Sequence, residues 1–391
     1  MVTFNKYKLK ELIKINNGKD YKHLSAGDIP VYGSGGLMSN VSACIHDGEA
    51  ILLPRKGSLG NIMYVNGPFW TVDTMYWAVV NSDIAYPKYL FYYLSLLDLS
   101  HRDSGSTLPS MTFDAYYSLV IDLPPMNVQK KVGDYLFLLS KKMENNNAII
   151  SELESMAKDI YDYWFVQFDF PDENGMPYKS SGGKMVWNEE LKREIPEGWM
   201  KGCISSIATL INDQVSPEDN EIYIHYSIPA FDSGRIPVKE QGSTIESNKY
   251  VISKEMILAS KLNPQFPRIW WPAFIEANMI CSTEFLPLIP NNELYRVFLY
   301  LLLKSDALCT EMKQKATCST GSRRRIDPDV FMSMCFALPT DKTIIAFSEK
   351  VFPIIEKVNV CLKENEELTS LRDFLLPLLM NGQVKIGEME P

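Results

Sequence analysis

Two long segments of this chain repeat the same pattern of apolar positions. Residues 123–164 and 338–379 align without a gap at an offset of 215 positions, and each segment opens on Leu-Pro. Within the first segment, apolar side chains recur at alternating spacings of four and three residues, which is the 3.5-residue repeat of a coiled-coil seam. The pattern therefore predicts two long helices that pack on each other.

Ten positions make up the seam of each predicted helix. The first seam contains Val132, Leu136, Leu139, Met143, Asn146, Ile150, Leu153, Ala157, Ile160 and Trp164, and the second contains Phe347, Val351, Ile354, Val358, Cys361, Asn365, Leu368, Arg372, Leu375 and Leu379. Each seam includes one asparagine, and a lone Asn in such a seam commonly sets its register. Pro353 should kink the second helix, and Pro377 should end or bend it. The alternative is that each helix packs only on its own domain.

A domain-sized segment precedes each long helix. Short runs rich in β-branched and aromatic residues, bounded by turn residues, predict strands in both segments. The predicted strands are 50–53, 62–65, 75–80, 223–228, 249–252, 256–260 and 285–289, and the predicted short helices are 89–97 and 295–304. The expected fold class is α+β: two α/β domains joined by two long antiparallel helices that form a coiled-coil spacer, with an internal pseudo-two-fold repeat.

The chain divides accordingly into five parts. These are a first domain (1–123), a central long helix (124–168), a linker (169–198), a second domain (199–337) and a distal long helix (338–386). The linker is rich in Pro, Gly, Ser and charge, so turns are expected to dominate it.

Composition limits the classes of protein that fit this layout. With 391 residues, 46% of them apolar, the chain can bury a sizeable core. No run approaches the roughly 20 apolar residues of a membrane span, and no apolar run of a signal peptide follows the N-terminus. The seven cysteines are scattered without a CxxC pair, as expected for reduced thiols in a cytosolic protein.

The net charge of −9 at first counts against nucleic acid as a partner. Residues 1–124 and residues 200–337, however, each have a net charge of −1, so the remaining charge of −7 lies in the helices, the linker and the tail. A near-neutral domain can carry a basic face, and electrostatic binding depends on that local face and not on the total charge.

Two motifs suggest enzyme chemistry, and both are incomplete. Residues 32–36 (Tyr-Gly-Ser-Gly-Gly) lack the GxGxxG frame of a nucleotide site, and a polar loop that touches a DNA backbone is the preferred interpretation. Residues 263–266 (Asn-Pro-Gln-Phe) resemble the Asn-Pro-Pro-Phe motif of amino-group DNA methyltransferases, with Gln265 in place of the second proline. Nothing resembling a nuclease site, a Ser/His/Asp arrangement or a structural zinc site stands out, so neither catalysis nor a metal is expected.

Basic and hydroxyl-rich loops supply the candidate DNA-binding residues of both domains. Arg and Lys contact phosphates, and Arg can also pair with guanine through two hydrogen bonds. The candidates are Ser34, Gly35, Arg55, Lys56, Ser58, Arg102, Ser106, Thr107, Lys261, Asn263, Arg268, Ser322, Arg323, Arg324 and Arg325. The run of three arginines is the most specific of these, because three successive residues cannot all lie on one face of a strand. The alternative for this run is a solvated turn.

Along essentially its whole length, the chain resembles the specificity subunit of type I restriction–modification systems. The resemblance rests on Leu-Pro-Pro at 123–125, the segment FPDENGMPYKSSGGK at 170–184, Glu-Ile-Pro-Glu-Gly-Trp at 194–199, and Leu371–Pro377 followed by Asn-Gly at 381–382. Residues 29–36 and 55–58 are also similar to the family. Pro353 and Arg372 depart from its pattern.

This resemblance implies how function is divided between subunits. The two domains would be target recognition domains, each binding one half of a bipartite double-stranded DNA target, and the paired helices would set the spacing and dock two modification (methyltransferase) subunits. Those partners would bring S-adenosylmethionine to methylate adenine, and restriction/translocase subunits would use ATP and Mg. The chain itself would bind none of these cofactors, catalyse no reaction, avoid membranes and act in a bacterial or archaeal cytoplasm in defence against foreign DNA.

Two other functions fit part of the pattern. A stand-alone adenine-specific DNA methyltransferase requires a cofactor loop and an intact Asn-Pro-Pro-Phe motif, and it should bind the cofactor as an isolated chain. A coiled-coil interaction protein without a nucleic-acid role should show no salt-sensitive DNA binding, whereas phosphate contacts make DNA affinity fall steeply with salt.

Overall fold

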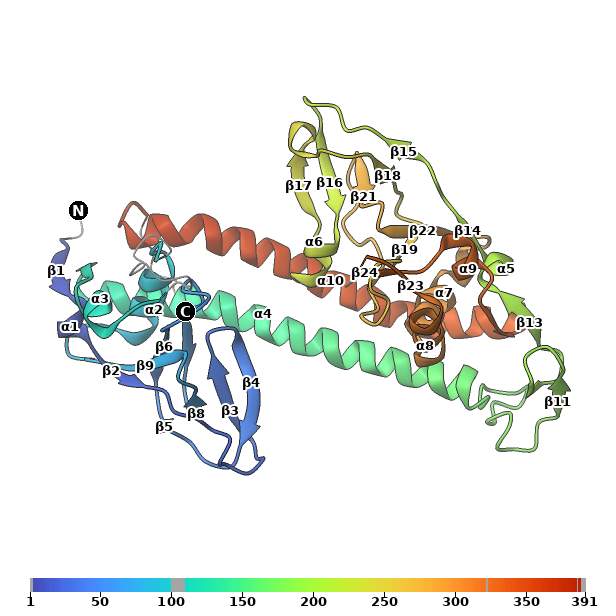
Figure 1. Ribbon diagram of the computed structural model, residues 1–391, viewed down its shortest axis with the longest axis horizontal. Coiled ribbons are helices and arrows are strands. Elements are labelled where there is room, and N and C mark those ends of the chain that lie inside the picture. The colour runs from blue at the N-terminus through green and yellow to red at the C-terminus, as the bar shows by residue number, and fades with distance from the viewer. Residues whose placement is uncertain (1–2, 100–109, 321–322, 385, 388–391) are drawn as a thin grey trace. The chain divides into compact units, whose positions relative to one another are not determined.

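The computed structural model describes residues 3–99, 110–320, 323–384 and 386–387. The chain forms two compact units: unit 1 consists of Met1–Met143 and Glu367–Pro391, and unit 2 consists of Glu144–Glu366. Each unit therefore contains one globular domain together with a part of each long helix (Figure 1).

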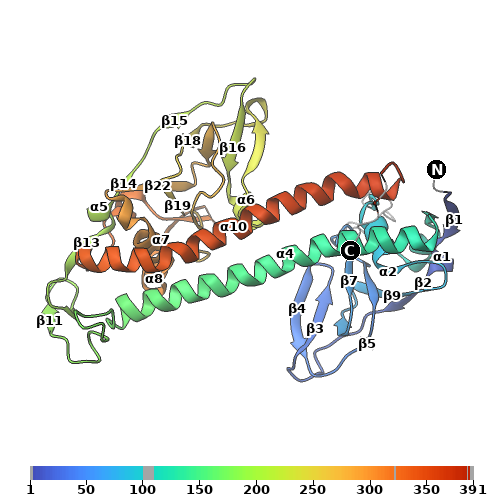
Figure 2. The ribbon, with the colours of Figure 1, turned by 180° about the vertical axis from the view of Figure 1, so that it is seen from behind.

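The two long helices form as expected. Helix α4 spans Met126–Tyr161 and continues as a π-helical turn over Asp162–Val166, and helix α10 spans Asp341–Met380. Within each unit the two helices lie side by side and antiparallel (Figures 1 and 2): Asn146 faces Asn365 in unit 2, and Met143 contacts Thr369 in unit 1. The prediction that the helices pack on each other is confirmed.

The long helices also complete the cores of both domains. In unit 1, Val132 and Leu136 of α4 lie in one buried cluster with Leu379 of α10. In unit 2, Tyr161 of α4 and Phe347 of α10 belong to the main buried cluster. All twenty predicted seam positions are buried or half-buried, so the seam side chains fill space between the helices and between the helices and the domains.

The two prolines of the second helix do not end it. Helix α10 continues through Pro353 and through Pro377 and ends at Met380. Of the two outcomes expected at Pro377, an end or a bend, the structure excludes an end of the helix. Both prolines are exposed, and burial of the neighbouring seam residues compensates for the backbone hydrogen bond that each proline removes.

The domain of unit 1 is built from short strands. Its elements are β1 (Asn5–Lys8), α1 (Leu9–Leu12), β2 (Ile13–Asn17), β3 (Ile29–Gly33), β4 (Gly36–Val41), β5 (His46–Asp47), β6 (Ala50–Pro54), β7 (Met63–Val65), β8 (Pro68–Thr71), β9 (Met75–Val80), α2 (Pro87–Ser95), α3 (Phe113–Tyr117) and β10 (Val120–Leu123). They form the pair β1–β10 and two four-stranded sheets, β2-β9-β6-β7 and β4-β3-β8-β5. Strands β3 and β8 are parallel, and the other pairs are antiparallel.

Unit 2 begins its domain after a hairpin and contains more elements. They are β11 (Met185–Asn188), β12 (Arg193–Pro196), β13 (Met200–Cys203), α5 (Ile204–Ile207), β14 (Ala208–Leu210), β15 (Gln214–Val215), β16 (Ile222–Tyr226), α6 (Ile228–Asp232), β17 (Val238–Gln241), β18 (Lys249–Val251), β19 (Ile257–Ser260), β20 (Ile269–Trp270), β21 (Met279–Cys281), β22 (Phe285–Pro290), α7 (Arg296–Lys304), α8 (Asp306–Lys315), β23 (Thr317–Thr320), β24 (Arg323–Arg325), α9 (Pro328–Met332) and β25 (Cys335–Leu338). Two 3₁₀ turns lie at Gly242–Thr244 and Glu293–Tyr295.

The sheets of unit 2 repeat those of unit 1. The pair β13–β25 corresponds to β1–β10, and the sheet β14-β22-β19-β20 corresponds to β2-β9-β6-β7. The sheet β15-β18-β21-β16-β17 again contains one parallel pair, β16–β21, which corresponds to β3–β8. The internal repeat predicted from the helices therefore extends to the topology of the domains, where sequence similarity is weak.

Helix α2 packs closely on α4 at Gly133. A Cβ at this position would lie 2.8 Å from the backbone N of Tyr89 and 3.0 Å from the ring Cδ1 of Tyr86. Four residues earlier, Oε1 of the buried Gln129 accepts a hydrogen bond from the backbone N–H of Tyr86 at 2.8 Å. The missing side chain at Gly133 thus sets how closely the first domain approaches the helix.

Residues 169–198 contain many turns, as expected, and they also form a strand pair that the sequence did not predict. Strands β11 and β12 pair as an antiparallel hairpin. The ring of Phe170 stacks on those of Tyr178 and Trp199, with centroid distances of 4.7 and 5.1 Å. Because Phe170 and Ile195 belong to the main buried cluster of unit 2, this segment is part of that core.

Candidate nucleic-acid interface

Three segments of unit 1 bring most of its described candidates together. They are the turn between β3 and β4, the loop between β6 and β7, and the chain before α3. The side-chain amide of Asn61 donates to the carbonyl of Ser34 at 2.9 Å, which ties the second segment to the first. The backbone N–H of Met111 donates to the carbonyl of Arg55 at 2.9 Å, and Lys56 forms an isolated β-bridge with Ser110, which ties the second to the third.

The equivalent segments of unit 2 make the same backbone contacts and a different side-chain contact. The loop between β19 and β20 begins at Lys261, whose carbonyl accepts a hydrogen bond from Ile326 N–H at 3.0 Å, and Leu262 forms an isolated β-bridge with Arg325. Asp232 at the end of α6, which lies between β16 and β17, binds Arg268 of the loop. Both domains therefore present basic candidates from the same place in their topology.

Asn263 holds the loop of unit 2 against the β23–β24 hairpin. Its backbone adopts the left-handed conformation with φ 49°. Its N–H donates to the carbonyl of Arg324 at 2.7 Å, and its side-chain oxygen accepts the Arg324 N–H at 3.0 Å. The Asn-Pro-Gln-Phe run is thus a loop whose asparagine has a structural role, with Phe266 exposed in it.

The three consecutive arginines occupy three different environments. They form β24 and not the solvated turn considered as an alternative. Arg323 is exposed. Arg324 is half-buried and donates from Nη2 to the carbonyl of Ala316 at 3.1 Å. Arg325 forms two hydrogen bonds to the carboxylate of Glu284, at 3.0 Å from Nε and 2.6 Å from Nη2. Only Arg323 of the run points its charge into solvent.

Ion pairs neutralise two of the candidate cations. The hydrogen bonds from Arg325 lower the pKa of Glu284, and those from Arg268 at 2.7 and 2.8 Å lower the pKa of Asp232. A phosphate would have to displace these carboxylates to bind either arginine. Lys56 and Arg323, both exposed, are therefore the cations best placed to contact a phosphate.

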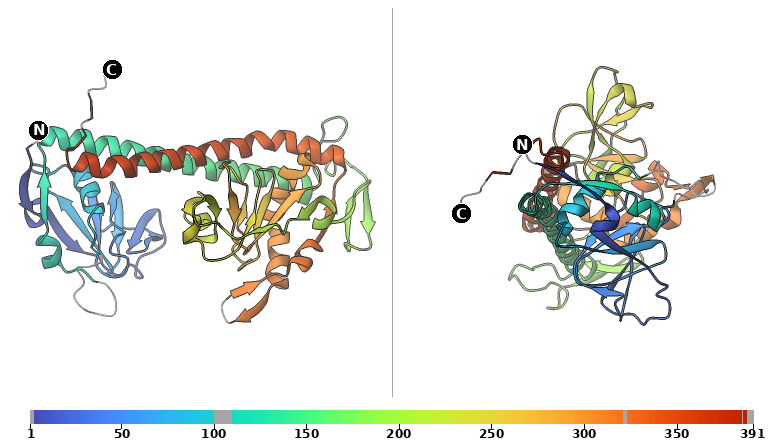
Figure 3. Two further views of the ribbon diagram at one scale, coloured as in Figure 1. Left: turned by 90° about the horizontal axis from the view of Figure 1, so that it is seen from above. Right: turned by 90° about the vertical axis from the view of Figure 1, so that its left-hand side faces the viewer.

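The β23–β24 hairpin projects from its domain on the side away from the two long helices (Figure 3, left). In unit 1, Arg55 lies in the β6–β7 loop, where its guanidinium is half-buried, donates to the carbonyl of Asp73 at 3.4 Å and lies 5.8 Å from the ring centroid of Tyr76. Ser58 is exposed in the same loop, and Gly35 is exposed in the β3–β4 turn. Arg102, Ser106, Thr107 and Ser322 lie outside the described residues.

Sequence reasoning missed the residues that position these loops. Asn61, Thr74, Asp232 and Glu284 carry no motif, and each acts through a partner distant in sequence. Thr74, for example, accepts the N–H of Ser34 at 3.5 Å. A search for acidic residues near basic loops would not have found Glu284, because it lies 41 positions from Arg325.

Among the described residues, no helix is both long enough and apolar enough to cross a membrane.

The chain is similar to proteins of one family. A sequence model described as the type I restriction modification DNA specificity domain matches residues 1–155. The HindI specificity subunit of Haemophilus influenzae is 21% identical over 417 residues, which cover 89% of each chain. The MjaIX specificity subunit of Methanocaldococcus jannaschii is 23% identical over 372 residues, which cover 87% of this chain and 78% of the relative.

A solved structure shares the fold. The crystal structure of the type I restriction–modification S subunit from M. genitalium aligns with a TM-score of 0.61 at 15% identity, and the alignment covers 100% of this chain and 97% of that one.

Proposed function

Because this chain belongs to the specificity subunits of type I restriction–modification systems, we propose that it recognises a bipartite DNA target, with one half-site bound by each domain. The observation that carries the proposal is the duplicated loop cluster. The β6–β7 loop of unit 1 and the β19–β20 loop of unit 2 both carry basic residues and are both anchored by the same backbone contacts. Two such clusters with different side chains suit two different half-sites.

The chemistry of the clusters fits a polyanionic ligand. Exposed Lys56 and Arg323 can neutralise phosphates, and hydroxyl and backbone N–H groups around Ser34 and Gly35 can donate to phosphate oxygens. Arg325 is held by the Glu284 carboxylate through Nε and Nη2, which is a way to present the rest of a guanidinium to a base edge at low entropic cost. The net charge of −9 does not oppose this, because the field that matters is local.

The two long helices are the proposed docking surface for two modification subunits. Outside their buried seams they keep large apolar side chains exposed, among them Leu138, Met156, Val360 and Phe374. These side chains lie singly along the helices and form no patch by themselves, so the docking role rests on the similarity to specificity subunits. The modification subunits would bring S-adenosylmethionine, the restriction subunits would use ATP and Mg, and the chain itself would contribute recognition without catalysis.

Methylome sequencing tests the proposal directly. DNA is taken from cells that express a modification subunit with or without this chain. A bipartite adenine-methylated motif that appears only with the chain is the expected result, and it would give both half-sites and their spacing. The absence of any new motif, in cells from which both subunits co-purify, would contradict the proposal.

A binding measurement separates the proposal from the alternative of a stand-alone methyltransferase. Equilibrium dialysis of the isolated chain against S-adenosylmethionine should show no binding, while the assembled complex should bind the cofactor. Cofactor bound by the isolated chain would favour the alternative.

A further inference from the structure

Two cysteines of unit 2 lie directly opposite each other in an antiparallel pair. Cys203 ends β13 and Cys335 begins β25, and the register pairs them with each other. Their Sγ atoms are 3.0 Å apart, about 1 Å more than the length of a disulfide bond. Both are half-buried, so small reagents in solvent can reach them. The sequence alone does not bring them together, because they are 132 positions apart.

The backbone around the two cysteines has the geometry of a cross-strand disulfide. The N–H of Ile204 donates to the carbonyl of Met334 at 3.1 Å, so Cys203 and Cys335 form the adjacent pair without mutual backbone hydrogen bonds. Consistently, the N–H of Cys203 donates instead to Oγ of Ser206 at 3.0 Å. In such pairs the Cα atoms are only about 4.5 Å apart, which lies within the range that a disulfide spans.

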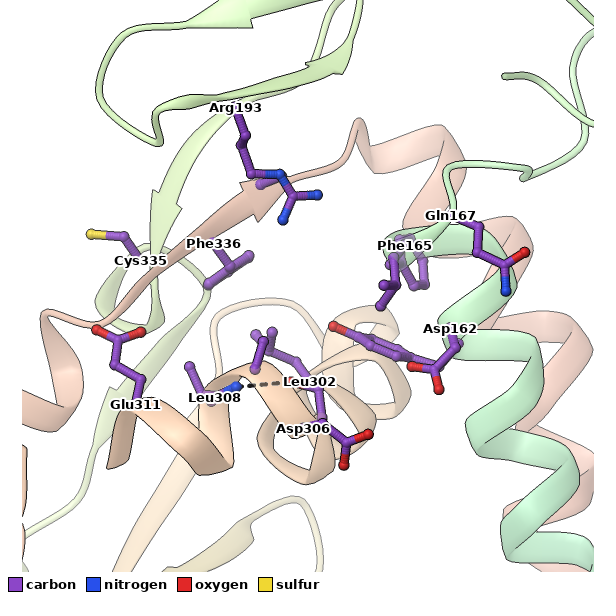
Figure 4. A pocket seen from close by; sticks show the side chains of 15 residues that line it. Asp162, Phe165, Gln167, Arg193, Leu302, Asp306, Leu308, Glu311, Cys335 and Phe336 are labelled. Atoms are coloured by element: carbon purple, nitrogen blue, oxygen red, sulfur yellow. Dashed lines mark hydrogen bonds between the residues drawn. The ribbon is translucent and has the colours of Figure 1, made fainter. Parts of the chain in front are cut away.

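Cys335 lies at the edge of a cavity of about 340 Å³ formed by the π-helical turn, β12, α8 and β25. In Figure 4 its sulfur points away from Phe336, the next residue of the strand. The thiol is therefore on the opposite face of β25 from the ring that lines the cavity, and no rearrangement of the cavity is needed for it to approach Cys203.

The same place in unit 1 shows that the fold does not require cysteine here. Lys8 and Val120 occupy the equivalent register. The N–H of Leu9 donates to the carbonyl of Leu119 at 2.8 Å, and the N–H of Lys8 donates to Oε1 of Glu11 at 2.9 Å. The backbone is thus the same with a Lys–Val pair, so this strand pair does not need the two thiols in order to form.

We propose that Cys203 and Cys335 are a redox modification site that forms a reversible disulfide with low-molecular-weight disulfides such as oxidised glutathione. One cysteine thiolate attacks a sulfur of the reagent, forming a mixed disulfide and releasing one reduced thiol. The second cysteine thiolate then displaces the remaining half as another thiol. In total two protein thiols lose their protons and are oxidised, and one reagent disulfide is reduced to two thiols.

The disulfide would join the first and last strands of the second domain. It would close a loop that contains the whole domain, and cross-links that close long loops restrict the unfolded chain most. We expect oxidation to raise the midpoint of thermal unfolding of unit 2 by on the order of 10 °C. This inference stands independently of the proposed function.

Mass spectrometry of the full chain tests the site. After incubation with oxidised glutathione, a digest should contain a peptide pair linked through Cys203 and Cys335, with a mass two hydrogen atoms below that of the two free peptides together. The Cys203→Ser variant should instead carry glutathione on Cys335 and lose the thermal shift. The Cys309→Ser variant is the matched control and should behave as the wild type.

Unit 1 supplies a second arm of the experiment. The double variant Lys8→Cys/Val120→Cys should form an equivalent disulfide under the same conditions. Complete modification of exposed Cys44 shows that the reagent has acted. If the wild-type chain then carries only separate mixed disulfides on Cys203 and Cys335, or if its linked peptides join other cysteines, the proposal is overturned. Since the wild-type chain gives this answer, it does not depend on how well any variant folds.

Discussion

Asn146 of α4 donates a hydrogen bond to the side-chain oxygen of Asn365 of α10 at 3.0 Å, and both asparagines are buried in the helix seam of unit 2. The amide of Asn146 also donates to Glu364 at 2.8 Å, and the amide of Asn365 donates to Asn147 at 2.8 Å. The single asparagine of one seam is thus hydrogen-bonded to the single asparagine of the other seam. A slip of either helix would leave these amides without partners, so the pair fixes the antiparallel register.

Replacing one asparagine of the pair should destabilise the chain more than replacing both. Asn146→Ala leaves the Asn365 amide buried with fewer partners, at a cost of about 1–3 kcal/mol. The double variant Asn146→Leu/Asn365→Leu removes both polar groups, and its free energy of unfolding should be close to that of the wild type or higher. Urea unfolding of the single and double variants measures the difference. Additive losses would show that the pair is not coupled.

Gly133→Ala should destabilise unit 1, although alanine usually favours a helix by about 0.5–1 kcal/mol over glycine. The added Cβ would lie 2.8 Å from the backbone N of Tyr89, so α2 must move, at a cost of about 1–3 kcal/mol. Thermal unfolding of the variant checks this. Lys130→Ala, at an exposed position of the same helix, should change stability by less than about 0.5 kcal/mol. A stabilised Gly133→Ala variant would disprove the close approach.

Glu154 should make stability depend on pH. Burial alone would raise its pKa, but Lys304 Nζ at 2.9 Å and Arg235 Nη1 at 2.7 Å together lower the pKa below its ordinary value near 4.5. A carboxyl with a lowered pKa stabilises the folded state above its unfolded pKa, and this contribution is lost as the pH falls through the folded value. Glu154→Gln should therefore cost about 2 kcal/mol at pH 7.

The pH profile of that variant is the diagnostic measurement. The difference in free energy of unfolding between wild type and Glu154→Gln should stay constant from pH 7 down to the ordinary pKa and should shrink below it. A difference that is independent of pH down to the acid limit would mean that the carboxylate charge does not stabilise unit 2.

Arg323 and Arg325 should respond differently to replacement by alanine. Arg323→Ala removes an exposed charge, so it should leave unfolding unchanged while weakening DNA binding of the assembled complex and lowering the salt slope by about one. Arg325→Ala breaks two hydrogen bonds to Glu284 and should also cost about 1 kcal/mol of stability. Fluorescence anisotropy over a salt series, with urea unfolding beside it, separates the two effects. Unchanged DNA affinity of Arg323→Ala would remove it from the interface.

The proposed spacing role of the helices can be tested by lengthening both. One heptad inserted into α4 between Met143 and Asn146, and one into α10 between Asn365 and Thr369, keeps both seams in phase. Seven helical residues add about 10 Å, or about three base pairs of spacer between half-sites at roughly 3.4 Å each. Methylome sequencing of the insertion variant should show this longer spacer. An unaltered spacer would mean that the helices do not set it.

How far the sequence predicted the structure depends on how local each interaction is. Leu136 and Ile150 belong to a periodic pattern within one segment and Val358 to the same pattern in the other segment, so the two helices and their pairing followed from these patterns. The domain sheets are built from strands of two to six residues, and their pairing joins positions far apart, such as Asn5 with Leu123. No short window of sequence contains that information.

The pairing of charges in the candidate site could not be predicted from the sequence for the same reason. The sequence locates Arg268 and Arg325 in loops, but it does not reveal that Asp232 and Glu284, 36 and 41 positions away, bind them. The sequence alone therefore does not distinguish the three arginines as candidate DNA contacts, although only Arg323 is exposed. The stacking of Phe170 on Trp199 was not predicted for a related reason: the turn-forming residues of its segment are obvious in the sequence, whereas the stacking depends on the folded domain.

The burial of Leu379 beside Leu136 in unit 1 also bears on how the protein is made. Leu379 is synthesised 243 residues after Leu136, so during translation the helix of the first domain is covered only after the whole of unit 2 has been made. If translation stopped within unit 2, the truncated product would lack Leu379. Its Val132 and Leu136 would then stay accessible to chaperones and proteases. A helix of unit 1 is thus covered only after all of unit 2 has been made, and products truncated within unit 2 are marked by their own uncovered helix.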